Sequence, residues 1–287
     1  MSSGHLTRTR VRELLERHEL GPSRALGQNF LCDPGTVDKI VRLAEVAEGD
    51  RVIEIGPGLG SLTVGLAMVG AAVTAIEIDR YLLPALEEVI APFEAVTVLN
   101  ADVRQVDWPS LLDDTAPTGS GRPEPDRPDG WKVVANLPYN IATPLLLDLL
   151  AAQPRLDRFL VMVQREAGER LAAPVGSKTY GIPSVLASYW ATVRVVGSVR
   201  AELFLPRPKV ESVLVELVRR PEPAVDVAYP ALAELVRAGF GQRRKMVRRS
   251  LVDRVTPEQF AAAGVDPTAR AEQLDIGAWG ALARVTE

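Results

Sequence analysis

A short apolar run at residues 52–55 leads directly into the glycine-rich segment Gly56-Pro57-Gly58-Leu59-Gly60, and an apolar stretch at 62–68 follows it. This order predicts a buried strand, a tight turn and the start of a helix. Glycine lets the backbone approach a ligand closely, and a helix N-terminus offers unpaired N–H groups. The spacing is G-x-G-x-G, which differs from the G-x-G-x-x-G fingerprint of dinucleotide-binding folds. The segment therefore predicts an α/β fold with a ligand site at the end of this strand.

Short apolar runs alternate with longer helical stretches over most of the chain. We expect strands at 52–55, 72–78, 95–99, 133–135, 159–163, 192–199 and 212–217, and helices flanking the sheet at 36–47 and 142–152. This alternation predicts an α/β domain over residues 1–221, with a seven-stranded, doubly wound sheet and a late hairpin. After Pro221-Glu222-Pro223 the pattern changes to short helices, expected at 229–239, 245–252, 257–263 and 268–284. We therefore predict a small all-α C-terminal domain over residues 222–287.

Acidic side chains accompany the ends of two further strands. Glu77 lies in the run 72–78, about twenty residues after Gly56, where an acid of such folds binds ribose hydroxyls. Asp102 follows the run 95–99 and can accept a hydrogen bond from an adenine amino group. Each acid alone is more simply a solvated loop carboxylate. Because the carboxyl ends of parallel strands meet at one crevice, the two acids and the glycine turn together favour a nucleoside site.

A polar and aromatic block directly follows the apolar run 133–135; it consists of Asn136, Leu137, Pro138 and Tyr139. The amide oxygen can accept an N–H from an exocyclic amine, the proline stiffens the turn, and the tyrosine ring can stack on a planar base. Four residues are a weak motif, and an ordinary Pro-Tyr turn would look the same. At the end of a strand in the same sheet, the block indicates methylation of nucleic-acid adenine.

The chain resembles a known family, the ribosomal RNA adenine N6-dimethyltransferases, which include the bacterial small-subunit enzyme whose loss gives kasugamycin resistance. The resemblance covers most of residues 24–255. It rests on blocks that occur in one order: Leu26-Gly27-Gln28-Asn29-Phe30-Leu31, Glu54-Ile55-Gly56-Pro57-Gly58-Leu59-Gly60, Asn136-Leu137-Pro138-Tyr139-Asn140-Ile141, Gln164-Arg165-Glu166, Ser177-Lys178-Thr179-Tyr180-Gly181, Phe204-Leu205-Pro206-Arg207-Pro208-Lys209-Val210-Glu211-Ser212 and Phe240-Gly241-Gln242-Arg243-Arg244-Lys245. The number of blocks makes the resemblance specific.

The resemblance implies a Rossmann-like class I methyltransferase domain with S-adenosylmethionine as the methyl donor. By position, it assigns donor contacts to Asn29, Leu31, Gly56, Gly58, Glu77, Asp102 and Asn136. In that family the first two close over the methionine end of the donor, and the two acids bind its ribose and its adenine. Tyr139 resembles the family's base-stacking aromatic residue, and Phe204 resembles the second aromatic residue that sandwiches the target.

These residue types support direct methyl transfer, in which a nitrogen attacks a sulfonium methyl that its positive charge already activates. No metal, covalent intermediate or strong base is required. Hydrogen bonds from the adenine amine to the Asn136 side chain and the Leu137 carbonyl would favour a pyramidal nitrogen, and alignment would supply much of the rate. Stacking on two aromatic rings would hold an extruded or loop adenine in line. The candidate catalytic residues are Asn136, Leu137, Pro138, Tyr139 and Phe204.

The formal net charge of −4 conceals a basic segment near the C-terminus. Seven basic residues lie from Arg237 to Arg254, against the single acid Asp253. A solvated charged helix face is the alternative interpretation. The match to the family's Gln-Arg-Arg-Lys block and the arginines at positions 8, 10, 12, 17 and 24 favour contact with RNA phosphates. We therefore predict RNA binding by Arg243, Arg244, Lys245 and Arg248.

Length and composition fit a cytoplasmic enzyme. The 287 residues with 47% hydrophobic content can bury one large core and one small one. No apolar run reaches the roughly 18 residues of a membrane span, and no signal-peptide stretch is visible. The single cysteine, Cys32, excludes an internal disulfide and a cysteine-rich metal cluster. His5 and His18 are expected at the surface, and residues 115–130, rich in proline, glycine and aspartate, are expected to form a surface loop.

Three functions remain open at this point. The resemblance favours dimethylation of small-subunit rRNA adenines in an immature small ribosomal subunit, by a monomeric enzyme. The related large-subunit rRNA methyltransferases of macrolide resistance share the Gln-Asn-Phe and Asn-x-Pro-Tyr blocks, but the blocks at 206–212 and 242–245 look more like the small-subunit family. A non-catalytic RNA-binding assembly factor on the same fold is the third possibility, although the intact block at 136–139 argues against lost catalysis.

Overall fold

The computed structural model describes residues 4–23, 26–113, 130–139 and 141–286. Two compact units are present. The sheet unit comprises Met1–Leu145, Gln153–Arg165 and Val195–Glu216, and the helical unit comprises Leu146–Ala152, Glu166–Arg194 and Leu217–Glu287. Arg24, Asn140 and nearly all of the expected loop at 115–130 lie outside the described residues.

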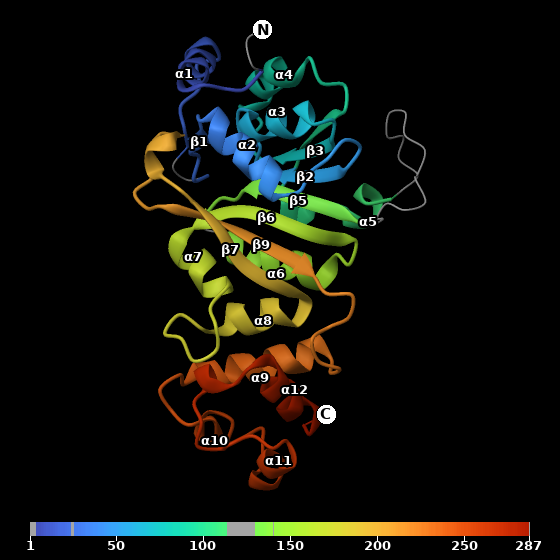
Figure 1. The fold of residues 1–287 in the computed structure, drawn as a ribbon, viewed down its shortest axis with the longest axis vertical. Coiled ribbons are helices and arrows are strands. Elements are labelled where there is room, and N and C mark those ends of the chain that lie inside the picture. Colours follow the sequence, from blue (N-terminus) through green and yellow to red (C-terminus); the bar gives the residue numbers. More distant parts are fainter. Residues whose placement is uncertain (1–3, 24–25, 114–129, 140, 287) are drawn as a thin grey trace. The chain divides into compact units, whose positions relative to one another are not determined.

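A seven-stranded sheet has the strand order β4-β3-β2-β5-β6-β9-β7 (Figure 1). Its strands are β2 (Arg51–Ile55), β3 (Ala72–Glu77), β4 (Val96–Asn100), β5 (Trp131–Asn136), β6 (Leu156–Gln164), β7 (Ala191–Val199) and β9 (Ser212–Arg219). The first five pair in parallel, so their carboxyl ends share one edge of the sheet. β2 lies in the middle of these five, with Ile53 opposite Thr74 of β3 and Val133 of β5. The predicted α/β fold and its seven strands are confirmed.

Helices connect the parallel strands and cover the sheet. They are α2 (Pro34–Leu43), α3 (Ser61–Met68), α4 (Leu83–Ile90), α5 (Trp108–Leu111) and α6 (Ala142–Ala152), with a 3-10 turn at Val103–Gln105. The start of α2 is fixed by the Asp33 side chain, which accepts the Thr36 N–H at 2.8 Å, and by Pro34 in the first turn. The expected helix at 36–47 thus begins two residues earlier and ends at Leu43.

The core of the sheet unit joins α2 and α3 to the central strands. Val37 of α2 and Leu62 and Leu66 of α3 belong to one buried cluster with residues of β2, β3, β5 and β6. Gly65 permits the two helices to approach closely, because a Cβ there would lie 2.3 Å from Val37 Cγ1. Removal of this apolar surface from water stabilises the unit. The same packing holds the first turn of α3 at the carboxyl edge of the sheet.

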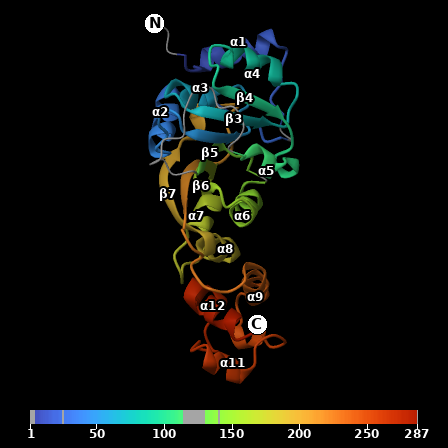
Figure 2. The same ribbon diagram turned by 90° about the vertical axis from the view of Figure 1, so that its right-hand side faces the viewer.

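The N-terminal residues form a helix that the sequence analysis did not predict. This helix, α1 (Arg8–Arg17), lies beside α4 in both views (Figures 1 and 2). The Glu88 carboxylate of α4 contacts Arg10 at 2.6 Å and His18 at 2.8 Å, and it also contacts Arg17. Two of the arginines expected to meet RNA phosphates are therefore ion-paired within the protein, and His18 has a structural partner.

The helical unit is built around one apolar cluster. Its helices are α7 (Arg165–Leu171), α8 (Ile182–Trp190), α9 (Tyr229–Gly241), α10 (Val247–Ser250), α11 (Pro257–Ala262) and α12 (Ile276–Arg284), with a 3-10 turn at Ala271–Gln273. Fully buried Trp279 and Phe260 belong to the cluster. Gly239 of α9 leaves room for the Trp279 ring, since a Cβ at that position would lie 2.4 Å from Cη2. Figure 2 shows α9 and α12 side by side.

The helical unit is larger than the predicted domain at 222–287. Tyr189 of the unpredicted helix α8 packs in the same cluster as the C-terminal helices, and its hydroxyl donates to the Val227 carbonyl at 2.7 Å. The expected helix at 268–284 is also broken, because the Asp275 side chain accepts the Ala278 N–H and starts α12 anew. Among the described helices, none is long and apolar enough to cross a membrane.

Candidate functional site

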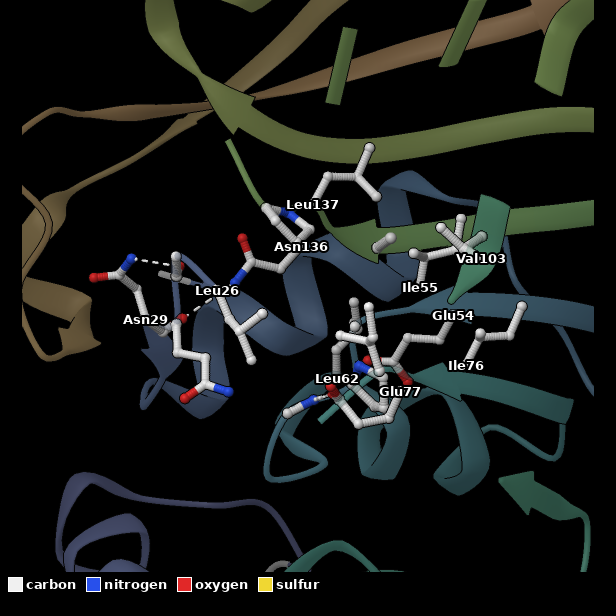
Figure 3. A pocket seen from close by; sticks show the side chains of 18 of the residues that line it. Leu26, Asn29, Glu54, Ile55, Leu62, Ile76, Glu77, Val103, Asn136 and Leu137 are labelled. Carbon is white, nitrogen blue, oxygen red and sulfur yellow. Dashed lines mark hydrogen bonds between the residues drawn. The ribbon is translucent and has the colours of Figure 1, made fainter. Parts of the chain in front are cut away.

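The carboxyl edge of the parallel strands surrounds one pocket in the sheet unit. It contains the glycine turn after β2, Glu77 at the end of β3, Asp102 after β4 and Asn136 at the end of β5. The predicted residues that line it are Asn29, Leu31, Gly56, Gly58, Glu77, Asp102, Asn136, Leu137, Pro138 and Tyr139. Figure 3 shows labelled side chains that reach the pocket from strands, such as Glu54 and Glu77, and from other segments, such as Asn29 and Leu62. The structure thus brings together nearly all candidate donor and catalytic residues.

The glycine turn adopts a backbone that residues with side chains rarely tolerate. Gly56, Gly58 and Gly60 have φ values of 71°, 60° and 89°. A Cβ on Gly58 would also lie 3.1 Å from the Phe30 ring. The Gly58 N–H donates to Glu77 Oε2 at 3.0 Å, which ties the turn to the end of the neighbouring strand. The turn therefore presents bare backbone to the pocket.

Glu77 is a buried carboxylate held by backbone donors. Its side chain is 4% exposed, Oε2 accepts the Gly58 N–H, and Oε1 accepts the Asp79 N–H at 2.8 Å. Burial raises the pKa of Glu77, while these N–H groups oppose the rise by stabilising the charged form. Each oxygen has a further lone pair, so the carboxylate can also accept hydroxyl groups of a ribose.

Glu54 is a pocket residue that the sequence analysis did not select. It lies on β2, is 1% exposed, and its Oε2 has no hydrogen-bond partner among the described residues. Burial raises the pKa of Glu54 to about 8, and the nearby charge of Glu77 adds to the rise. The signal available in the sequence was a single charged residue inside the otherwise apolar run 52–55.

Asp102 lies beside the pocket in a pair with Arg104. Arg104 Nε donates to Asp102 Oδ1 at 3.0 Å, and its Nη2 donates to Oδ2 at 2.6 Å. These hydrogen bonds lower the pKa of Asp102, so the group stays ionised. Both residues line the pocket. A ligand amine that reaches Asp102 would share the carboxylate with this arginine.

Asn136 is oriented by a hydrogen bond across the pocket. Its Nδ2 donates to the backbone carbonyl of Asn29 at 3.2 Å, and the Asn29 side chain in turn donates to the Gly27 carbonyl at 2.9 Å. Figure 3 shows the Asn136 amide oxygen on the side away from Asn29. Because the amide oxygen is the only acceptor of the side chain, it is the atom that Asn136 can offer to the N–H of a ligand amine.

Tyr139 is fixed at both its ring and its hydroxyl. The ring is half-buried and lines the pocket, and the hydroxyl lies 2.8 Å from Ser212 Oγ at the start of β9. Burial raises the pKa of Tyr139, so the phenol stays neutral. The preceding Leu137 is anchored by its N–H, which donates to the Met162 carbonyl at 3.1 Å. The Tyr139 hydroxyl is therefore anchored to β9, and its ring lines the same pocket as Asn136.

Phe204 is placed differently from the expectation. Its side chain is 0% exposed and belongs to the core of the sheet unit, so it does not line the pocket. It lies in β8 (Phe204–Leu205), which pairs antiparallel with β1 (Phe30–Leu31), and its register partner is Leu31. A ring enclosed by apolar neighbours has no face free to stack on a base. In this arrangement Tyr139 lines the pocket, and Phe204 belongs to the core next to β1.

The basic segment contains both anchored and exposed residues within the helical unit. Arg243 Nε donates to Glu272 Oε2 at 2.7 Å, and Nη2 donates to the Lys178 carbonyl at 2.7 Å. Arg243 therefore ties down the loop that contains Lys178. The other predicted RNA-binding residues are exposed: Arg244, Lys245 and Arg248. The charge of Arg248 acts on the Asp266 carboxylate and helps to lower its pKa. No cluster of metal-ligating side chains occurs among the described residues.

Comparison with known proteins gives the family. The sequence profile described as "Ribosomal RNA adenine dimethylase" matches residues 22–286. A "Ribosomal RNA small subunit methyltransferase A" from Bifidobacterium longum subsp. infantis is 40% identical over 308 aligned residues, which cover 100% of this chain and 95% of that protein. The protein of the same name from Kineococcus radiotolerans is 41% identical over 95% of this chain and 89% of its own length.

Two solved structures agree in fold. The 23S rRNA methyltransferase ErmE has a TM-score of 0.67 at 26% identity, covering 90% of this chain and 99% of that one. A dimethyladenosine transferase from Plasmodium falciparum has a TM-score of 0.71 at 24% identity, covering 88% and 95%. The buried acids, the bare glycine turn and the oriented amide fit S-adenosylmethionine, the donor expected from the motifs. The chain belongs to the ribosomal RNA adenine dimethylase family and is a methyltransferase of that kind.

Proposed function

We propose that this enzyme transfers methyl groups from S-adenosylmethionine to the N6 amines of adjacent adenines in a hairpin loop of small-subunit rRNA, giving N6,N6-dimethyladenosines in an immature small subunit. The observation that carries the proposal is one pocket in which two ribose- and base-binding acids, Glu77 and Asp102, lie with Asn136 and Tyr139. Relatives that are 40% and 41% identical are named for the small subunit, which supports this substrate over large-subunit rRNA.

At the donor end, the residues bind and orient a nucleoside. Glu77 accepts the ribose hydroxyls, Gly56 and Gly58 let the backbone approach, and Asp102 accepts from the adenine amine. Asn29 and Leu31 line the same pocket from the segment before α2 and border the methionine end. The donor, when bound, supplies a methyl group on a positively charged sulfur. Two buried acids on neighbouring strands, Glu54 and Glu77, suit a ligand of that charge.

At the acceptor end, the residues hold the adenine amine in line. The Asn136 amide nitrogen is engaged with the Asn29 carbonyl, so its oxygen accepts one N–H of the amine. The Leu137 carbonyl accepts the other, and Pro138 stiffens the turn between them. Tyr139, held by Ser212, stacks on the base, an interaction worth about 1–3 kcal/mol per base in single-strand binders. Catalysis is then mainly alignment of nitrogen, methyl and sulfur.

The stacking role is tested by Tyr139→Ala. We expect methyl transfer to rRNA to fall by about 5- to 150-fold with little change in donor affinity, since the loss of one stacked base contact corresponds to about 1–3 kcal/mol. Tyr81→Ala is the matched control, because this tyrosine is 66% exposed and does not line the pocket. Full methylation by Tyr139→Ala, or an equal loss in both variants, would contradict the role.

The phosphate contacts are tested by charge reversal in the helical unit. Arg244→Glu combined with Lys245→Glu should weaken rRNA binding and reduce the dependence of log affinity on log salt by about 0.7 per lost contact. Arg243→Glu should also disturb the loop that Arg243 anchors. The substitution replaces the ion pair with Glu272 by two acids that repel each other. Arg42→Glu, an exposed position on α2, controls for net charge. Unchanged affinity of the double variant at moderate salt would exclude phosphate contact.

The substrate is tested by offering labelled donor with purified immature small subunits and with large subunits. Incorporation into small-subunit rRNA only, at adjacent adenines and with two methyl groups each, supports the proposal. Incorporation only into large-subunit rRNA would assign the chain to the function of ErmE, and none into either would favour an RNA-binding factor. Light scattering and fractionation of the expressing cells test the accompanying proposals that the enzyme is a monomer and acts in the cytoplasm.

A further inference from the structure

Glu54 is a buried acid in the donor pocket that the alignment mechanism does not use. It lies on β2 directly before the glycine turn, is 1% exposed, and lines the pocket. Its Oε2 has no hydrogen-bond partner in the described part of the chain. Buried polar atoms are nearly always paired, so a carboxyl oxygen left unpaired at a binding site needs an explanation. The simplest explanation is a charged partner that arrives with the ligand.

A second carboxyl group shares this part of the pocket. Both oxygens of Glu77 accept backbone N–H groups, from Gly58 and Asp79, whereas Glu54 has one oxygen without a donor. Two neighbouring buried carboxyl groups do not both ionise readily. The backbone donors keep the charge on Glu77, and the proton resides on Glu54. Burial and the Glu77 charge raise the pKa of Glu54 to about 8, against a partly offsetting effect of Thr63.

The remaining charged groups of the pocket do not change the conclusion that Glu54 carries the proton. Asp102 and Arg104 also line it, and they form an ion pair with each other. Neither contributes to the pKa shift of Glu54. Glu54, with its pKa raised to about 8, is therefore the carboxyl group of the pocket that we take to carry a proton at neutral pH.

The donor and its product differ in charge. S-adenosylmethionine carries an ammonium, a carboxylate and a sulfonium, and the product after methyl transfer retains the ammonium and the carboxylate but has a neutral thioether. We propose that Glu54 releases its proton to solvent when the positively charged donor enters and takes one up again once the sulfur is neutral, so that this carboxyl makes the pocket prefer donor to spent product. The inference rests on the proposed function only in its choice of donor.

Proton linkage fixes what such a group does to affinity. An opposite charge nearby lowers the pKa of a carboxyl group, and the protons released on binding equal the slope of log affinity against pH. Donor affinity should therefore rise by up to tenfold per pH unit below about pH 8 and level off above it, in keeping with the pKa of about 8 for Glu54. The slope should be smaller for the product, because it lacks one positive charge. The ratio of donor to product affinity should increase over the same interval.

Isothermal titration calorimetry of the full-length protein tests this without any RNA. At pH 7, titrations of S-adenosylmethionine and S-adenosylhomocysteine in buffers of different ionisation enthalpy count the protons released. We expect release of close to one proton with the donor and clearly less with the product. Glu54→Gln, which resembles the neutral carboxyl in shape, should release none and should lose most of the preference for donor. Glu54→Asp retains a titratable group and should keep measurable release.

Glu87→Gln, an exposed acid on α4, is the matched control and should behave like the wild-type protein. Absence of proton release from the wild-type protein, or equal release from Glu54→Gln, would overturn the inference. A melting curve confirms that each variant is folded. Because the readout is donor binding, proton release combined with failure to methylate small-subunit rRNA would reject the proposed substrate and leave the role of Glu54 intact.

Discussion

The buried acid of β2 also predicts how the stability of the ligand-free protein depends on pH. Glu54 has an ordinary pKa of 4.5 when unfolded and about 8 when folded. For a group whose folded pKa is raised, the neutral form contributes stability that is fully present below the unfolded value and is lost as pH rises through the folded value. A change from 4.5 to about 8 corresponds to about 5 kcal/mol above pH 8 and to about 3 kcal/mol at pH 7.

Glu54→Gln removes the loss of stability at higher pH, because glutamine stays neutral in both the folded and the unfolded protein. We expect the variant to match the wild-type protein near pH 4.5, to exceed its free energy of unfolding by about 3 kcal/mol at pH 7, and to gain little more beyond pH 8. Urea unfolding followed by circular dichroism at a series of pH values measures the difference, and the exposed variant Glu87→Gln shows the effect of charge alone. A difference between Glu54→Gln and wild type that does not change from pH 5 to 8 would refute the reasoning.

Four further substitutions test the packing, the glycine turn and the hydrogen bond of Tyr139. Gly65→Ala should lower the free energy of unfolding by about 1–3 kcal/mol, because the new Cβ would lie 2.3 Å from Val37 Cγ1, and a second substitution, Val37→Ala, should restore part of the loss. Gly58→Ala should weaken donor binding measured by calorimetry, since the residue has a φ of 60° and its Cβ would crowd the Phe30 ring. Tyr139→Phe should keep most methyl transfer and lose about 1 kcal/mol of stability in chemical denaturation, because the ring remains while the hydrogen bond to Ser212 is removed.

The sheet could be predicted well from the sequence because buried strands appear there as short apolar runs. The strands β2, β3 and β5 lie where the runs were found, and the glycine turn follows β2 as expected. The N-terminal helix α1 was missed because its arginines looked like ligands for RNA. Two of them, Arg10 and Arg17, instead pair with Glu88 of α4, which lies 78 and 71 residues away in the sequence, and no local pattern shows such a pairing.

The candidate site was predictable to the extent that it follows from strand topology. Glu77, Asp102 and Asn136 meet because parallel strands end at one edge of the sheet. This meeting could be inferred from the order of the strands without knowledge of side-chain contacts. The motif placed Phe204 beside the target base, whereas the structure buries its ring in the core. A motif fixes only the residue type and its order in the chain, and burial depends on packing against distant segments. Arg243 shows the same limit, since only the fold reveals that Glu272 and the Lys178 carbonyl hold it.

Product exchange is the step at which the two proposals for the pocket can be compared. Dimethylation of an adenine uses two donors, so spent product must leave the pocket and fresh donor must enter before the second transfer on the same base. A site that relied on Glu77 and the glycine turn alone would bind donor and product with similar affinity, because both molecules contain the same ribose and adenine. Glu54 lies on β2, next to the strand that carries Glu77, and lines the same pocket. The positive charge of the sulfonium distinguishes donor from product, and a carboxyl group responds to that charge. A wild-type enzyme should therefore tolerate accumulated product better than Glu54→Gln during successive turnovers, most clearly at pH values near 8.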